Sequence, residues 1–155
     1  MNTKLVSTLL LVCLGLFAGT ASAAQFRVAL FSKTAGWHHE SINAGVTAIR
    51  ELAALHDFEV FWTEDASRVF NDKELPKYQA VIFLCTTGDV LNDEQQAAFE
   101  RYIRAGGGYV GIHSASDTEY DWEWYTKMVG YMFHIHPAVQ TATVQVEERN
   151  FPGMD

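Results

Sequence analysis

The stretch Gly106-Gly-Gly-Tyr-Val-Gly-Ile-His-Ser-Ala-Ser-Asp117 decides how this chain folds. Its three leading glycines predict the end of a helix, because glycine adopts the left-handed conformation after a helix without a Cβ penalty. Residues 109–112 are an apolar run of strand length. Polar side chains follow at once: His113, Ser114, Ser116 and Asp117. In an open α/β sheet, ligands bind at this carboxyl end of the strands.

Three further segments upstream predict strands. Residues 25–31 and 58–63 are mainly apolar, and residues 79–85 are almost wholly so. A strand that is apolar on both faces suits the middle of a parallel sheet. Together with residues 109–112, these segments supply four strands.

Helices are expected between the strands. Residues 40–55 carry an apolar stripe at helical spacing, made by Ile42, Val46, Ile49 and Ala53. Asn92 stands three residues before Gln95, the spacing of a capping box, and predicts the start of a second helix. Residues 121–129 predict a short aromatic-rich helix, and the alternation in residues 138–147 predicts a half-exposed or edge strand.

Strands that alternate with helices indicate a parallel sheet with helices on both faces. Right-handed crossovers then favour a three-layer, flavodoxin-like α/β arrangement. We expect one such domain over residues 24–155, because about 130 residues suffice for one core.

Residues 1–23 read as a secretory signal peptide. Lys4 gives a positive start, residues 5–18 are mostly apolar, and Ala21-Ser-Ala23 is a small-residue cleavage signal. The apolar run is too short for a membrane span, so no membrane insertion is expected after cleavage. A lipoprotein signal at Cys13 is the weaker alternative, because Val12 is bulky for the position before a lipidated cysteine.

Charge and cysteine content narrow the class of protein. The formal net charge of −8 becomes −9 when cleavage of the signal peptide removes Lys4. An acidic surface argues against nucleic acid as a partner. Cys85 is then alone, so an intrachain disulfide is excluded. An exported protein without disulfides fits a bacterial periplasm or the secreted medium. The sequence carries no signal for an oligomeric state.

Histidines gather at one predicted edge of the sheet. His39 lies after the first strand, His113 after the fourth, and His136 precedes a proline further on. Histidine suits general acid–base catalysis near neutral pH, with Asp117 available to orient an imidazole. The same three histidines are also candidate ligands of a divalent metal such as zinc, although their spacing matches no strong zinc motif. The alternative is that they are ordinary loop histidines.

Five other residues are candidates for substrate binding. Trp37 and Trp122 offer aromatic faces on which sugars stack, although core packing is the commoner role of such residues. Thr87 and Gly88 offer backbone N–H groups to an oxyanion, although an ordinary turn explains them equally well. Ser114 adds a hydroxyl beside His113.

The motifs together resemble a known family. They are Gly36-Trp-His-His-Glu-Ser-Ile42, Thr86-Thr-Gly-Asp-Val-Leu91, Gly106 to Ala115, and Gly130 with Phe133 and His136-Pro137. In order and spacing they resemble the ThuA-like, or trehalose-utilisation, family from about Arg27 to Val146. The resemblance implies a class I glutamine amidotransferase-like fold and a role in the catabolism of trehalose and related disaccharides through 3-keto sugar intermediates. It also implies that His39, His113 and His136 correspond to histidines of the family's motifs.

This chain differs from the related proteins in two respects. True amidotransferases of this fold have a nucleophilic cysteine at the turn where this chain has His113, so a Cys-dependent amidotransferase is not expected. Members of the family are longer, which implies that the C-terminal part of the domain is missing from this chain.

Two kinds of function stay open on the sequence. The first is an enzyme that acts on a disaccharide or 3-keto sugar by histidine acid–base chemistry, with or without a metal. The second is a non-catalytic sugar-binding or accessory domain. In both, the partner is a small carbohydrate.

Overall fold

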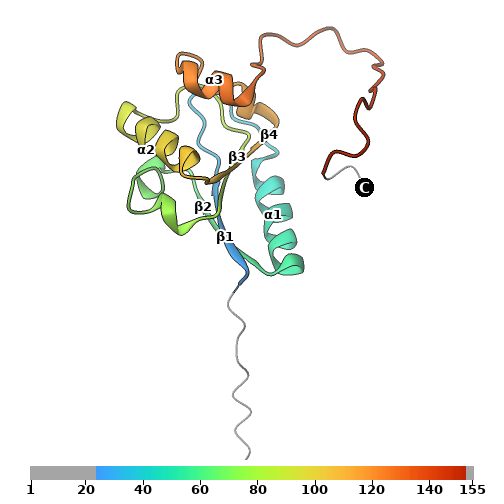
Figure 1. Ribbon diagram of the computed structural model, residues 1–155. Coiled ribbons are helices and arrows are strands. Elements are labelled where there is room, and N and C mark those ends of the chain that lie inside the picture. Colours follow the sequence, from blue (N-terminus) through green and yellow to red (C-terminus); the bar gives the residue numbers. More distant parts are fainter. Residues whose placement is uncertain (1–23, 153–155) are drawn as a thin grey trace, which may run out of the picture.

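A single parallel sheet organises the part of the chain that the structure describes, residues 24–152 (Figure 1). In this computed structural model the strands are β1 (Phe26–Phe31), β2 (Phe58–Thr63), β3 (Ala80–Leu84) and β4 (Gly108–Ile112). Their order is β2-β1-β3-β4, and every neighbouring pair is parallel. The predicted signal peptide, residues 1–23, lies outside the described residues.

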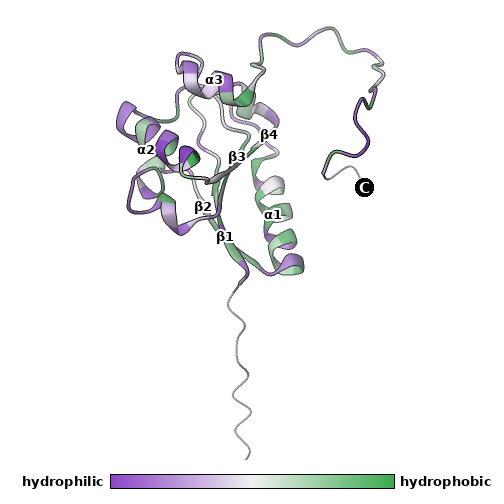
Figure 2. Ribbon diagram, in the orientation of Figure 1, coloured by the Kyte–Doolittle hydropathy of each residue, from purple (hydrophilic) through white to green (hydrophobic). Residues whose placement is uncertain are grey.

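Helices cover the sheet on both faces, so the predicted three-layer, flavodoxin-like fold is confirmed. Helix α1 (Ile42–His56) packs on one face against alternate residues of β1 and β3, such as Leu30 and Ile82. Helices α2 (Asp93–Arg104) and α3 (Glu123–Val129) pack on the other. Figure 2 shows that β1 is largely hydrophobic, that α1 carries many hydrophobic residues, and that α2 is more hydrophilic.

Aromatic rings fill the core beneath α2 and α3. Phe83, fully buried in β3, has its ring centroid within 5.3–5.8 Å of those of Phe31, Phe70, Phe99 and Tyr125. Burying a phenylalanine side chain stabilises a fold by roughly 1.5–3 kcal/mol. Because β3 contributes side chains to both faces, its wholly apolar sequence is explained by its central place.

Helix α2 begins and ends as its sequence predicts. The Asn92 side chain accepts a hydrogen bond from Gln95 N (2.9 Å), and the Gln95 side chain accepts one from Asn92 N (3.0 Å), which completes the capping box. At the other end, Gly106 has a φ of 97°, a conformation that favours glycine. A Cβ at Gly107 would lie 2.3 Å from the Tyr102 ring. The turn that leads into β4 therefore depends on glycine.

Residues 138–147 contradict the prediction of an edge strand. Within residues 24–152 they pair with no strand, and the Val139 and Val144 side chains are exposed. Figure 1 shows this segment leaving the body after α3. The sequence does alternate apolar and polar residues here, but such a segment forms a strand only where a neighbouring strand supplies hydrogen bonds. No helix within residues 24–152 has the length and apolar character of a membrane span.

Candidate functional site

A pocket of about 200 Å³ brings the predicted catalytic residues together. It lies where β4 ends, at the carboxyl edge of the sheet. Its lining consists of His39, His113, Ser114, Ser116, Asp117, Phe133 and His136. The three histidines come from three segments that are distant in sequence, so the fold and not a local motif assembles the site.

His113 occupies a sharp turn at the end of β4. Its φ of 57° is left-handed, and it begins the short 3-10 helix η3 (His113–Ser116). For a residue with a Cβ, this conformation costs about 1–2 kcal/mol. The turn that was predicted after residues 109–112 is thus present, with an exposed imidazole at its apex. Strained residues of this kind concentrate at functional sites.

His39 and His113 form a close pair in the pocket. Their ring centroids lie 4.5 Å apart, and their planes are nearly perpendicular at 83°. Burial, and then the neighbouring His113, lower the pKa of His39, while Asp117 opposes the shift. Ser114 Oγ lies 3.4 Å from His39 Nδ1 and gives that nitrogen a hydroxyl neighbour. At neutral pH the His39 imidazole is therefore neutral and able to accept a proton.

A hydrogen-bond network at Asp117 supports the other side of the pocket. Tyr120 Oη lies 2.5 Å from Asp117 Oδ1 and 2.7 Å from the Phe133 carbonyl oxygen. Phe133 N donates to the Ser116 carbonyl at 2.8 Å. The Phe133 and His136 rings lie 4.7 Å apart. Tyr120 was not among the predicted residues, because no local pattern indicates that it reaches residue 133.

The surroundings of Tyr120 keep its hydroxyl protonated. Burial, and then the hydrogen bond and negative charge of Asp117, raise the pKa of Tyr120 to about 12. The phenol is therefore a hydrogen-bond donor throughout the neutral range.

Thr87 and Gly88 use their polar groups inside the protein. The Thr87 hydroxyl donates to the Trp37 carbonyl (2.9 Å) and accepts from Gly36 N (3.2 Å). Gly88 N donates to the Asp117 carbonyl at 2.8 Å. Neither residue lines the histidine pocket. Both residues therefore join neighbouring loops through hydrogen bonds. Their contact with substrate stays a prediction.

The two candidate tryptophans lie in different environments. Trp37 is 75% exposed on the loop after β1. Trp122 is half-buried and packs against Trp124 and Tyr125, with ring centroids 5.1 and 5.8 Å away. Trp122 therefore packs against the core beneath α3, which is the commoner role of a tryptophan. Of the pair, only Trp37 presents a largely open aromatic face.

Glu119 is a second residue that sequence reasoning missed. It is buried, has a φ of 56°, and accepts hydrogen bonds from Val90 N (2.7 Å) and Leu91 N (2.8 Å). Gln96 Nε2 donates to its other oxygen at 2.6 Å. Burial raises the pKa of Glu119, and these hydrogen bonds oppose the shift. This carboxyl joins the loop after β3 to the loop that carries Asp117.

Metal binding by His39, His113 and His136 stays a prediction. Across residues 24–152, no three or more His, Cys, Asp or Glu side chains converge as a ligand set. The three imidazoles line one pocket, with the His39 and His113 ring centroids 4.5 Å apart. Cys85, which is buried at the end of β3, lies outside the lining of this pocket, with Sγ 3.7 Å from Ser41 Oγ.

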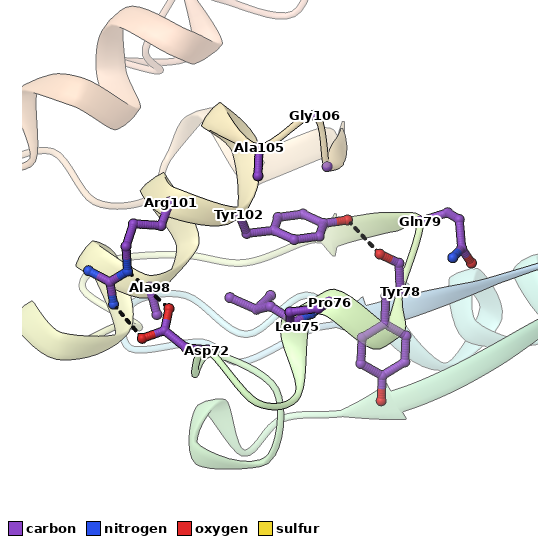
Figure 3. A pocket seen from close by; sticks show the side chains of 11 residues that line it. Asp72, Leu75, Pro76, Tyr78, Gln79, Ala98, Arg101, Tyr102, Ala105 and Gly106 are labelled. Atoms are coloured by element: carbon purple, nitrogen blue, oxygen red, sulfur yellow. Dashed lines mark hydrogen bonds and ion pairs between the residues drawn. The ribbon is translucent and has the colours of Figure 1, made fainter.

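A larger hollow of about 560 Å³ lies between α2 and the segment before β3 (Figure 3). Its charged groups, Arg101 and Asp72, bind each other through two hydrogen bonds of 3.0 and 2.8 Å. The Tyr102 hydroxyl donates to the Tyr78 carbonyl at 3.1 Å. Since these groups are already paired and no histidine lines the hollow, the smaller pocket is the better candidate for chemistry.

Comparisons with known proteins agree with this architecture. The sequence model of the ThuA family, described as trehalose utilisation, matches residues 27–155. The crystal structure of a ThuA-like protein from Bacteroides uniformis is similar, with a TM-score of 0.58 and 26% sequence identity. The match covers 75% of this chain and 48% of that protein, so this chain spans about half the length of its structural relative. No curated protein matches the sequence.

Proposed function

The chain belongs to the ThuA family. On this basis we propose that it acts in carbohydrate catabolism as an enzyme that removes a proton from a sugar by acid–base catalysis. The observation that supports this most is the convergence of His39, His113 and His136 with Asp117 in one pocket. The family description, trehalose utilisation, supplies the class of substrate. A 3-keto derivative of a disaccharide is the proposed reactant.

The chemistry follows from the acidity of a ketone. Hydrogens on the carbon next to a sugar carbonyl are acidic enough for a neutral imidazole to remove one. We assign this step to His39, whose pKa is lowered by burial and by His113. The electrons of the broken C–H bond move onto the carbonyl oxygen and give an enolate. We assign the hydrogen bond to that oxygen to His113, whose ring centroid lies 4.5 Å from that of His39.

Asp117 and Ser114 complete the proposed assignment. Ser114 Oγ, 3.4 Å from His39 Nδ1, helps to set which ring nitrogen carries the hydrogen. To Asp117, which lines the same pocket, we assign the acceptance of a hydrogen bond from a sugar hydroxyl or an imidazole. In an isomerisation, the hydrogen of the neighbouring hydroxyl moves to the enolate oxygen, and His39 returns its proton to the former carbonyl carbon, so that the neighbouring carbon becomes the new carbonyl. In an elimination, the enolate electrons reform the carbonyl and expel a leaving group from the β-carbon.

The decisive experiment compares His113→Ala with the unchanged chain on oxidised disaccharides, with and without added divalent metal. We expect the variant to lose turnover at least 100-fold, the usual scale of one acid–base group, and to keep its unfolding temperature. Leu55→Ala is a matched control, because that side chain is 75% exposed at the C-terminal end of α1 and does not line the pocket. Full turnover by a folded His113→Ala protein would refute the proposal.

A sugar-binding domain without catalysis is the second candidate, and the 75% exposure of Trp37 favours it. An open indole is a platform for the apolar face of a sugar ring. This function predicts that calorimetry detects disaccharide binding without product, and that Trp37→Ala weakens binding more than His113→Ala does. Equal or opposite effects of the two changes would exclude it.

Export to the periplasm or the medium is part of the proposal. It rests on the positive, apolar and small-residue regions of residues 1–23. Expression in a bacterial host, followed by mass spectrometry of the protein outside the cytoplasm, should find a chain that begins at Ala24. A chain that stays in the cytoplasm with Met1 would contradict it.

A further inference from the structure

Residues 131–136 reach the pocket although four of the six are exposed. Gly130, with a φ of 88°, ends α3 and turns the chain. Tyr131, His134, Ile135 and His136 are exposed, whereas Met132 and Phe133 are half-buried. This segment nevertheless contributes Phe133 and His136 to the lining of the pocket. A few specific interactions must therefore hold it in place.

Met132 packs against the core, and the backbone of Phe133 makes the polar interactions. Its N–H donates to the Ser116 carbonyl at 2.8 Å, and its carbonyl oxygen lies 2.7 Å from Tyr120 Oη. The backbone of one residue is thus held on both sides, by η3 and by Tyr120. The Phe133 ring lies 4.7 Å from that of His136, so the position of Phe133 influences that of the imidazole.

From these contacts we propose that Tyr120 is the positioning residue that seats His136 in the site. Its hydroxyl joins Asp117, which belongs to the loop after β4, to Phe133, which belongs to the segment that carries His136. Tyr120 does not itself line the pocket, so it acts through the two groups that it contacts. This role rests on the proposed function only in so far as His136 takes part in the reaction.

The tyrosine hydroxyl has one hydrogen and faces two acceptor oxygens. Donation to the Asp117 carboxylate leaves the Phe133 carbonyl without that hydrogen, and the converse also holds. Tyr120 can satisfy both contacts fully only when the Asp117 side chain donates to the phenol oxygen. An amide in place of the carboxyl supplies such a donor, so Asp117→Asn should preserve the contact between Tyr120 and the Phe133 carbonyl.

The test is NMR of the labelled whole chain without substrate. Tyr120→Phe should accelerate solvent exchange of the Phe133 amide roughly two- to tenfold, the change expected for the loss of one hydrogen bond. It should also move the His136 ring-proton signals toward those of a free histidine. Asp117→Asn should not accelerate that exchange. Tyr131→Phe, which removes a hydroxyl from a 90% exposed side chain of the same segment, should leave both readouts unchanged.

Three outcomes would overturn the proposal. The first is unchanged Phe133 exchange and His136 signals in Tyr120→Phe. The second is an equal change in Tyr131→Phe. The third is a matching loss of protection at Phe83 in β3, because that would mean general destabilisation. The NMR readouts need no turnover, so they decide the role of Tyr120 even if the proposed reaction fails.

Where turnover is found, a double variant adds a second readout. A residue that acts through His136 should cost nothing further once His136 is gone, so Tyr120→Phe with His136→Ala should match His136→Ala alone. Multiplied losses in the double variant would show that Tyr120 acts elsewhere and would overturn the proposal.

Discussion

Replacement of Glu119 by alanine tests how firmly the loops of the site are held. In the folded protein its carboxyl accepts two backbone hydrogen bonds, from Val90 N and Leu91 N, and one from the Gln96 side chain. Alanine removes all three acceptor contacts. Both Glu119 and alanine have a Cβ, so the left-handed backbone at this position is equally strained in each, and the comparison isolates the carboxyl.

The size of the effect follows from the two buried N–H groups. A buried donor left without an acceptor costs about 1–3 kcal/mol. Gln96 is half-buried and can turn toward water, so its bond contributes little to the loss. Water that enters the space offsets part of the penalty at Val90 and Leu91. We therefore expect Glu119→Ala to lower the free energy of unfolding by about 3 kcal/mol.

Urea unfolding followed by tryptophan fluorescence and circular dichroism measures this change. Glu123→Ala is the matched control, because its carboxylate is 80% exposed and makes only an ion pair with Lys127, at 2.6 Å. That variant should cost at most about 0.5 kcal/mol. If Glu119→Ala also costs less than about 1 kcal/mol, the buried N–H groups have other acceptors, and the reasoning is refuted.

The contribution of the Glu119 carboxyl to stability should also depend on pH. Burial raises the pKa of Glu119 above its value of about 4.3 in an unfolded chain. Its contribution to stability is then fully present below pH 4.3 and is lost as the pH rises through the higher folded-state pKa. Glu119→Gln does not titrate there, so the stability advantage of the unchanged chain over this variant should shrink as the pH rises. An advantage that grows over this window would contradict the shift.

Three more predictions follow from single contacts. His39 should titrate by NMR below 6.5, and His113→Ala should raise its pKa, because His113 is the second largest cause of the lowering; an unchanged value would argue against the coupling. Gly107→Ala should cost at least about 2 kcal/mol in urea unfolding, because the added Cβ would lie 2.3 Å from the Tyr102 ring, whereas Gly106→Ala would strain only the backbone. Asn92→Ala should cost about 1 kcal/mol by loss of the capping box, and a negligible change would mean that water replaces the cap.

Local sequence patterns predicted most of the sheet and its helices. The stripe from Ile42 to Ala53 became α1, and the capping pair at Asn92 became the start of α2. These predictions succeed because the information lies within a few residues of each element. The failure at residues 138–147 has the converse cause. A strand is completed by a neighbour, and no sequence window shows whether that neighbour is present.

The histidine pocket was predictable for a topological reason. Parallel strands end at one edge of a sheet, so His39, in the loop after β1, and His113, at the end of β4, were expected at the same edge. Contacts such as Tyr120 with Phe133, or Glu119 with Leu91, were not predictable. They join loops 13 and 28 residues apart, and their geometry depends on how each loop turns.

The left-handed turn at His113 sets stability against activity at a single position. Glycine would adopt a φ of 57° without the penalty of about 1–2 kcal/mol, and would lose part of this gain, roughly 0.5–1 kcal/mol, to greater freedom in the unfolded chain. His113→Gly should therefore be at least as stable as the original and more stable than His113→Ala, although it lacks the imidazole. Engineering that selects only for heat resistance would remove the side chain on which the proposed chemistry depends.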